Sequence, residues 1–143
     1  MERKTFVIDA NIFLELLLDQ NQAEVCAQLL QFLEDKGHTI VITLFAIYGM
    51  EVVLEAKGAG EVIKSLLQRC QQSLVIEVLH TNLEEEHEIF TVAQQQRLDI
   101  DDAHQYWAAK KLNALFVSFD KDFDHTDLQR LEPKTILAQH LSQ

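Results

Sequence analysis

Short apolar runs rich in β-branched residues alternate along this chain with longer segments whose apolar residues have helical spacing. The runs lie at Thr5–Ile8, Thr39–Thr43, Leu74–Leu79 and Leu115–Phe119. Such runs are typical of strands that are buried on both faces, and parallel strands need helical crossovers between them. The alternation therefore predicts an α/β fold in three layers, with a mostly parallel central sheet covered by helices on both faces.

The ends of the predicted helices carry suitable capping residues. Thr43 is placed to cap the helix after the second strand, and Thr81 or Asn82 to cap the one after the third. Leu128–Leu131 is a candidate short edge strand, and Pro133 can open a final helix. The chain lacks a Pro/Gly/Ser-rich linker and internal repeats, which predicts a single domain over residues 1–143.

The charge balance limits how this protein can meet nucleic acid. Its 143 residues hold 12 Lys and Arg against 23 Asp and Glu, a net charge of −11. A protein that binds nucleic acid by bulk charge needs an excess of cations, so that class is excluded, whereas an enzyme that reaches phosphates through metal ions is not. The longest apolar stretch, Ile40–Met50, is far shorter than the ~20 residues of a membrane helix, and no signal peptide precedes the first strand. We therefore expect a cytoplasmic protein without membrane contact.

Acidic residues from separate segments are predicted to meet at one edge of the sheet. Asp9 ends the first strand, Asp120 follows the fourth, Asp101 and Asp102 open the helix before it, and Glu51 lies in the helix after the second strand. In such sheets ligands bind outside the carboxyl ends of the strands. Carboxylates without nearby His or Cys favour Mg²⁺ or Mn²⁺, and such ions support phosphodiester hydrolysis.

Each of these acidic residues also has a purely structural explanation. An Asp after a strand often forms only a turn or a helix cap, which Asp101 in particular could do. Glu51 taken alone is typical of a solvated helix face. The combination of Asp9, Asp102 and Asp120 at three element ends is what favours a metal site.

Two segments resemble a known family. FVIDANIFLE (Phe6–Glu15) is similar to the opening of PIN domains, and DDAHQYWAAKKLNALFVSFDKDFD (Asp101–Asp124) resembles their Asp-Ala helix, apolar strand and Ser/Thr-x-Asp turn. PIN domains are metal-dependent nucleases, and many small members are toxins of the VapC-like type. The resemblance implies metal carboxylates at Asp9, Asp102 and Asp120.

The same resemblance implies supporting roles for two polar residues and a fourth carboxylate. Asn11 matches a hydrogen-bonding support two residues after the first Asp, and Ser118 matches a small hydroxyl that orients the acidic cluster. The second acidic residue of the family lies on the helix after the second strand. Glu51 is our choice for it, and Glu55, one turn further along, is a rival because the local motif is not sharp.

The family resemblance implies an endoribonuclease that uses Mg²⁺ or Mn²⁺ to cleave RNA. Many small members act as toxins held by a separate antitoxin protein, and many form homodimers. Lys121 and Arg130, near the Asp120 turn, are candidates for holding the RNA backbone.

Two other functions compete with a nuclease. The first is a catalytically inactive PIN-like scaffold for RNA or a protein partner, which gains weight from the acidic balance and the weak motif around Glu51. The second is an aspartyl-phosphate phosphatase with Asp9 as nucleophile. Such enzymes normally carry a second Asp two residues later as the general acid, and here that position is Asn11, which cannot take this role.

Overall fold

A five-stranded sheet forms the centre of the computed structural model, which describes residues 2–141. The strands are β1 (Thr5–Ile8), β2 (Thr39–Thr43), β3 (Ile76–Leu79), β4 (Leu115–Val117) and β5 (Arg130–Leu131). They lie in the order β3-β2-β1-β4-β5, and each strand is parallel to its neighbours. The predicted α/β class with a parallel sheet is confirmed.

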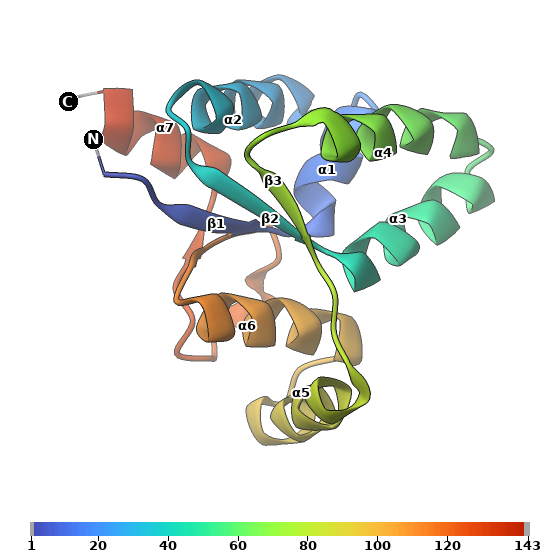
Figure 1. Ribbon diagram of the computed structural model, residues 1–143, viewed down its shortest axis with the longest axis vertical. Coiled ribbons are helices and arrows are strands. Elements are labelled where there is room, and N and C mark those ends of the chain that lie inside the picture. The colour runs from blue at the N-terminus through green and yellow to red at the C-terminus, as the bar shows by residue number, and fades with distance from the viewer. Residues whose placement is uncertain (1, 142–143) are drawn as a thin grey trace.

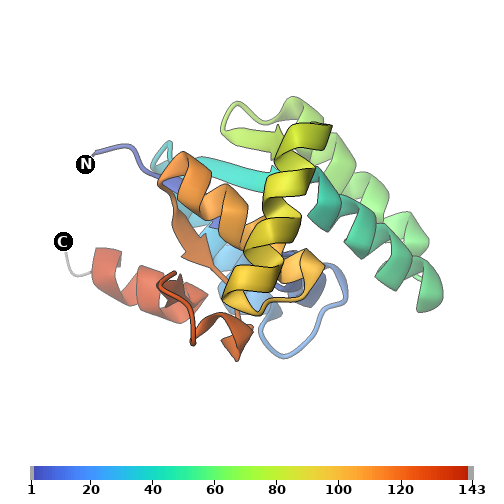
Figure 2. The ribbon, with the colours of Figure 1, turned by 90° about the horizontal axis from the view of Figure 1, so that it is seen from below.

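Helices cover both faces of this sheet. They are α1 (Ala10–Leu17), α2 (Ala23–Asp35), α3 (Leu44–Ala56), α4 (Ile63–Gln72), α5 (Leu83–Gln96), α6 (Ile100–Leu112) and α7 (Pro133–Leu141), with short 3₁₀ turns η1 (Gly60–Val62) and η2 (Lys121–Phe123). Figure 1 shows α5 and α6 below the sheet and the other helices above it or at its side. Figure 2 looks onto the lower face, with α5 and α6 in front. None of the described helices is both long and apolar enough to cross a membrane.

The strands feed two separate cores because their side chains alternate between the faces. On β1, Phe6 and Ile8 pack into the core between the sheet and helices α1, α2, α3 and α7. Val7 packs into the core between the sheet and helices α5 and α6. All three side chains are fully buried, as the apolar pattern of the run predicts. Burial of both faces is what fixes the sheet between two helical layers.

Three predicted strands are shorter in the structure, and the fourth ends at Val117 rather than at Phe119. The third begins at Ile76 rather than at Leu74, since the Ser73 hydroxyl accepts hydrogen bonds from the backbone N–H groups of Val75 and Ile76, and Leu74 points into solvent. The edge strand is reduced to Arg130–Leu131. A local side chain to backbone turn competes with the ladder at such ends.

The predicted helix caps at Thr43 and Asn82 are confirmed. The Thr43 hydroxyl accepts from the backbone N–H of Ala46 at 3.0 Å and so begins α3. Asn82 and Glu85 form a reciprocal capping box at the start of α5, with hydrogen bonds of 2.8 and 3.0 Å.

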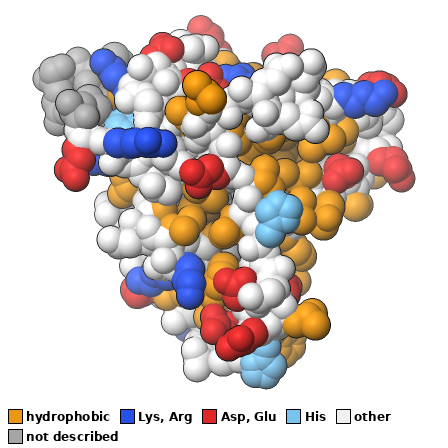
Figure 3. Space-filling view, in the orientation of Figure 1, with side chains coloured by type: hydrophobic (Ala, Val, Ile, Leu, Met, Phe, Trp, Pro, Cys, Tyr) orange, Lys and Arg blue, Asp and Glu red, His pale blue; other side chains and the backbone are white. Residues whose placement is uncertain are grey.

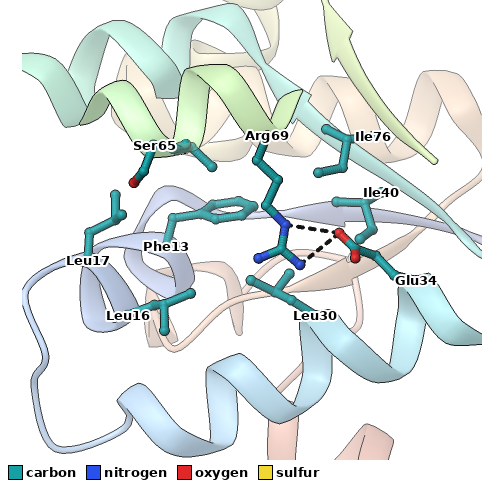
Figure 4. A pocket seen from close by; sticks show the side chains of 10 residues that line it. Phe13, Leu16, Leu17, Leu30, Glu34, Ile40, Ser65, Arg69 and Ile76 are labelled. Atoms are coloured by element: carbon teal, nitrogen blue, oxygen red, sulfur yellow. Dashed lines mark hydrogen bonds and ion pairs between the residues drawn. The ribbon is translucent and has the colours of Figure 1, made fainter. Parts of the chain in front are cut away.

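A mostly apolar cavity of about 230 Å³ lies among α1, α2 and α4, with side chains of Phe13, Leu17 and Leu30 in its wall. Figure 4 shows Arg69 of α4 reaching across it to Glu34 of α2, where Nε and Nη2 donate to one carboxylate oxygen at 3.0 and 2.8 Å. This ion pair links α2 to α4 over the apolar wall.

The strand order places one reversal between β1 and β4. From β1 the chain moves outward through β2 to β3, and α5 and α6 then carry it back across the opposite face to β4 on the other side of β1. The loops after β1 and β4 therefore diverge at this point, which is where α/β sheets of this kind bind ligands.

The left-handed residue that ends α5 provides a test of the local geometry. Arg97 has φ +54°, a conformation that is costly for a residue with a Cβ, so Arg97→Gly should stabilise the protein by about 1 kcal/mol. The same change at the exposed helical residue Gln94 should destabilise it by about 1 kcal/mol. Urea unfolding of both variants measures the two effects. Equal signs would contradict the assigned helix end.

Candidate active site

Asp9 lies where β1 meets β4 and is held by both strands. Its backbone N–H donates to the carbonyl oxygen of Val117 at 2.9 Å, in the continuation of the β1–β4 pairing. Its carboxylate accepts from the backbone N–H of Ala10 at 2.8 Å and thereby caps α1. The side chain is 8% exposed, so a carboxylate is fixed in a largely buried position at the reversal of the sheet.

A small hydrogen-bond network joins Asp9 to the loop after β4. The Ser118 hydroxyl donates to Oδ2 of Asp9 at 2.6 Å and accepts from the backbone N–H of Asp120 at 2.9 Å. The Asn11 amide donates to the same Asp9 oxygen at 3.3 Å and to Ser118 Oγ at 3.2 Å, while its oxygen accepts from the Phe119 N–H at 3.3 Å. Asn11 and Ser118 therefore fix the orientation of Asp9 relative to Asp120.

Further carboxylates reach this edge from α6 and η2. Asp102, in the first turn of α6, is 7% exposed, and Asp120 begins η2 by accepting from the N–H of Asp122 at 2.9 Å. One carboxylate oxygen each from Asp102, Asp120 and Asp122 lies within 4.8 Å of the others, and the same holds for Asp99, Asp101 and Asp102. Asp102 belongs to both groups and links them.

Burial and mutual repulsion raise the proton affinity of two of these groups. Desolvation raises the pKa of Asp9 to about 6, opposed by the hydrogen bonds from Ser118 and Ala10 and assisted by the charge of Asp120. Desolvation together with neighbouring carboxylates, first Asp101 and then Asp120, raises the pKa of Asp102 to about 7. Both shifts mean that the charged forms of Asp9 and Asp102 are unfavourable in this environment.

A pocket of about 270 Å³ opens beside these carboxylates. Its acidic rim consists of Asp9, Asp101, Asp102 and Asp120, and its apolar wall consists of Leu14 of α1 with Phe45, Ala46, Gly49 and Val53 of α3. Ala10, Asn11 and Gln105 complete the lining. The pocket is thus acidic on one side and apolar on the other.

Glu51 is not brought to this pocket. The residues of α3 that line it share one face of the helix, and they are Phe45, Ala46, Gly49 and Val53. Glu51 lies two residues, about 200°, away from Gly49. Glu51 and Glu55 are both exposed. None of the α3 residues that line the pocket is a carboxylate.

The two predicted RNA-contacting cations have different environments. Lys121 is exposed on η2 and lines a neighbouring hollow together with Asp102 and Asp122. Arg130 has a side chain only 11% exposed and is engaged by Asp124 at 3.0 Å and Glu132 at 2.8 Å. The structure therefore leaves Lys121 available to a phosphate and commits Arg130 to internal ion pairs.

Gln105 was missed by sequence reasoning and lies in the pocket lining. It is 3% exposed, and its Nε2 donates to the Thr43 hydroxyl at 3.0 Å. The available signal was its spacing, because Gln105 follows Asp102 by three residues on α6 and so shares its helix face. A neutral residue between the buried aromatic residues of this helix gave no chemical reason to select it.

The donor set fits a hard divalent cation. Asp9, Asp102 and Asp120 offer carboxylate oxygens from three elements, and neither His nor Cys lines the pocket among the described residues. Oxygen ligands of this kind suit Mg²⁺ and Mn²⁺. A bound cation would also relieve the repulsion that raises the pKa values of Asp9 and Asp102.

Comparison with known structures finds the same fold in several bacterial and archaeal proteins. PAE2754 from Pyrobaculum aerophilum superimposes with a TM-score of 0.67 at 18% identity, covering 98% of this chain and 91% of that one. The toxin VapC20 from Mycobacterium tuberculosis, described as cleaving the sarcin-ricin loop, gives 0.70 at 12% identity, covering 87% and 96%. VapBC2 from Rickettsia felis, solved with a promoter DNA fragment, gives 0.66 at 18% identity, covering 90% and 98%.

The family assignment rests on the sequence itself. A search of curated proteins found no match. The PIN domain family model, in contrast, matches residues 6–128, which span the sheet from β1 to the turn after β4 and include every residue of the acidic rim. The chain belongs to the PIN domain family.

Proposed function

We propose that this protein is a metal-dependent endoribonuclease that hydrolyses RNA phosphodiester bonds. The observation that carries the proposal is that the carboxylates of Asp9, Asp102 and Asp120 line one pocket. Burial and neighbouring carboxylates raise the pKa of Asp9 and Asp102 there, so their charged forms are unfavourable without a cation. Membership of a family of nucleases and the position of the pair at the sheet reversal support it.

In this proposal Asp9, Asp102 and Asp120 hold Mg²⁺ or Mn²⁺, and Asp101 adds negative charge at the rim. The bound cation supplies an activated water and stabilises charge on the phosphodiester. Ser118 and Asn11 keep the Asp9 carboxylate in one orientation through the bonds described above. That orientation means the site need not reorganise when the cation binds.

RNA would be held locally rather than by the whole surface. A net charge of −11 opposes extended contact with a polyanion, and the cation in the acidic rim would reverse that repulsion at one point. Lys121, next to Asp120, is the cation placed to contact a neighbouring phosphate, and Arg130 is not, because its guanidinium is held by Asp124 and Glu132.

An antitoxin partner is part of the proposal. The similar structures include VapBC2 from Rickettsia felis, a toxin–antitoxin complex from Klebsiella pneumoniae and FitAcB from Neisseria gonorrhoeae. We infer that this chain acts in the cytoplasm as the toxin of such a pair.

The inactive scaffold is the second candidate function, and one observation favours it. Among the described residues of α3, no carboxylate lines the pocket, so the acidic residue that the family resemblance implies on this helix is missing from the site. An aspartyl-phosphate phosphatase is disfavoured, because Asn11 is bound to Asp9 and Ser118 as a structural amide.

We also propose that α3 pairs with α3 of a second copy. The only charged side chains of this helix are those of Glu51 and Glu55, and the apolar side chains of Tyr48 and Val52 are 57% and 70% exposed. Figure 3 shows hydrophobic side chains gathered at the lower edge of α3. Tyr48 and Val52 are four residues apart and therefore share one helix face, and neighbouring exposed apolar side chains of this kind mark an interface. Light scattering of the wild type should give the mass of two chains, and that of Val52→Asp should give the mass of one chain. A wild-type protein that remains a monomer at high concentration would contradict the pairing.

The nuclease proposal predicts selective loss of activity. Asp9→Asn and Asp102→Asn should each reduce Mn²⁺-dependent cleavage of single-stranded RNA by at least roughly 100-fold, because each removes a buried metal carboxylate. EDTA should abolish wild-type cleavage. Glu51→Gln should retain activity within about twofold, since Glu51 is exposed outside the pocket.

The matched control for these variants is Glu84→Gln, which removes an exposed carboxylate from the first turn of α5. It should cleave like the wild type. If the Asp9 and Asp102 variants, purified in the same way as the wild type, cleave RNA as fast as the wild type does, the nuclease proposal is rejected.

The raised pKa values predict an unusual pH dependence of stability. Between pH 4 and 7 the folded protein keeps protons on Asp9 and Asp102 that the unfolded chain releases, so the free energy of unfolding should fall as pH rises through this range. Urea unfolding of wild type and Asp102→Asn isolates the contribution of Asp102, because Asn stays neutral. Near pH 7, Mn²⁺ should remove the difference in the free energy of unfolding between the wild type and Asp102→Asn. A wild-type free energy of unfolding that Mn²⁺ does not change would favour the inactive scaffold.

A further inference from the structure

Gly49 is a glycine that nothing within the protein requires. It lies in the interior of α3 with helical geometry, where glycine is the poorest residue after proline. A Cβ added at this position would meet no atom within 4 Å. Neither close packing nor a left-handed backbone therefore explains it. Glycine also serves where a ligand must approach the backbone closely.

Gln105 carries a second unexplained feature on the other side of the same pocket. Among the residues that the structure describes, its Oε1 has no hydrogen-bond partner although the atom is buried. The Thr43 hydroxyl can donate or accept, so turning the amide over leaves the other end free instead. One hydrogen-bonding position of Gln105 is open in either orientation. Gln105 lines the pocket, and because the terminal torsion of glutamine is soft, a rotation about it would present this position to a ligand.

Gly49 and Gln105 face one space. Both line the pocket beside the acidic rim, and Phe45, Ala46 and Val53 extend the apolar wall around Gly49. One side of the Phe45 ring is covered by His104, with the ring centres 4.1 Å apart. The pocket, at about 270 Å³, is much larger than the roughly 30 Å³ that a water occupies. An apolar wall with one buried polar group is the pattern of a site for an organic ring.

We propose that this pocket receives one unpaired nucleobase of the strand whose phosphodiester lies at the acidic rim. The inference rests on the proposed ribonuclease function and names the part of the substrate that the pocket recognises. The flat face of the base lies on the apolar wall at Gly49, and its edge exchanges one hydrogen bond with the free end of the Gln105 amide. Unpaired bases are bound in this way, by stacking and edge contacts, in single-strand recognition.

Binding of the base can be tested without catalysis. The full chain, labelled with ¹⁵N and kept in EDTA, is titrated with adenosine, guanosine, cytidine or uridine, and with ribose as the base-free probe. We expect at least one nucleoside to shift the Gly49 backbone and Gln105 side-chain amide signals with a dissociation constant on the order of millimolar. Ribose should shift neither. Equal shifts from ribose and every nucleoside, or none, would overturn the proposal.

Variants that fill the pocket provide the second measurement. Gly49→Leu should reduce kcat/KM on single-stranded RNA at least tenfold and abolish the nucleoside shifts. Gln105→Leu should weaken nucleoside binding at least tenfold. The matched control is Ala56→Leu, which adds the same side chain to an exposed position at the far end of α3.

The variants also separate a binding role from a structural one. Gly49→Ala should raise the melting temperature by roughly 2–5 °C, because alanine favours the helix and meets no neighbour. Gly49→Leu should melt no lower than wild type. If Gly49→Leu keeps full nucleoside binding, the proposal is wrong; if wild type binds nucleosides but does not cleave RNA, only the proposed ribonuclease function fails.

Discussion

The parallel pairing of β1 with β4 is the interaction on which the acidic edge depends. These strands are far apart in sequence, and their neighbouring carboxyl ends place Asp9 beside the Ser118–Asp120 turn. The Asp9 N–H extends this pairing by one bond to Val117, and the Ser118 hydroxyl then connects the two loops through the carboxylate itself. Because the crossover through α5 and α6 must return to β4, the first turn of α6 delivers Asp102 to the same edge.

Much of this arrangement could be predicted from the sequence, since it depends on strong local patterns. Apolar β-branched runs fix the strands, and capping residues such as Thr43 and Asn82 fix where helices begin. The carboxyl ends of parallel strands meet at one edge by geometry, so the proximity of Asp9 and Asp120 follows once their strands are known. The ladder ends were less predictable, as at Leu74, because a local turn and the ladder compete for the same backbone groups.

The rest of the site depends on how a helix rotates about its axis and on which side chains form ion pairs. Neither can be predicted from a single sequence. Glu51 and Gly49 are two residues apart on α3, and which of them faces the pocket depends on how the helix rotates when it packs on the sheet. The family resemblance suggested Glu51. Arg130 had the right charge near the Asp120 turn, yet Asp124 and Glu132 take its guanidinium. Such pairings are set by tertiary distances of a few ångström.

Four exceptions to ordinary structural rules lie together at one pocket. Asp9 and Asp102 are buried acids whose charged forms the protein disfavours, Gln105 has a buried amide with one end free, and Gly49 is a helical glycine without a packing reason. Each feature costs stability, and each would be removed by a conservative substitution. Scattered over the fold, they would indicate only imperfect packing. Because all four line the same pocket at the sheet reversal, the proposed cation and the proposed nucleobase would together account for them.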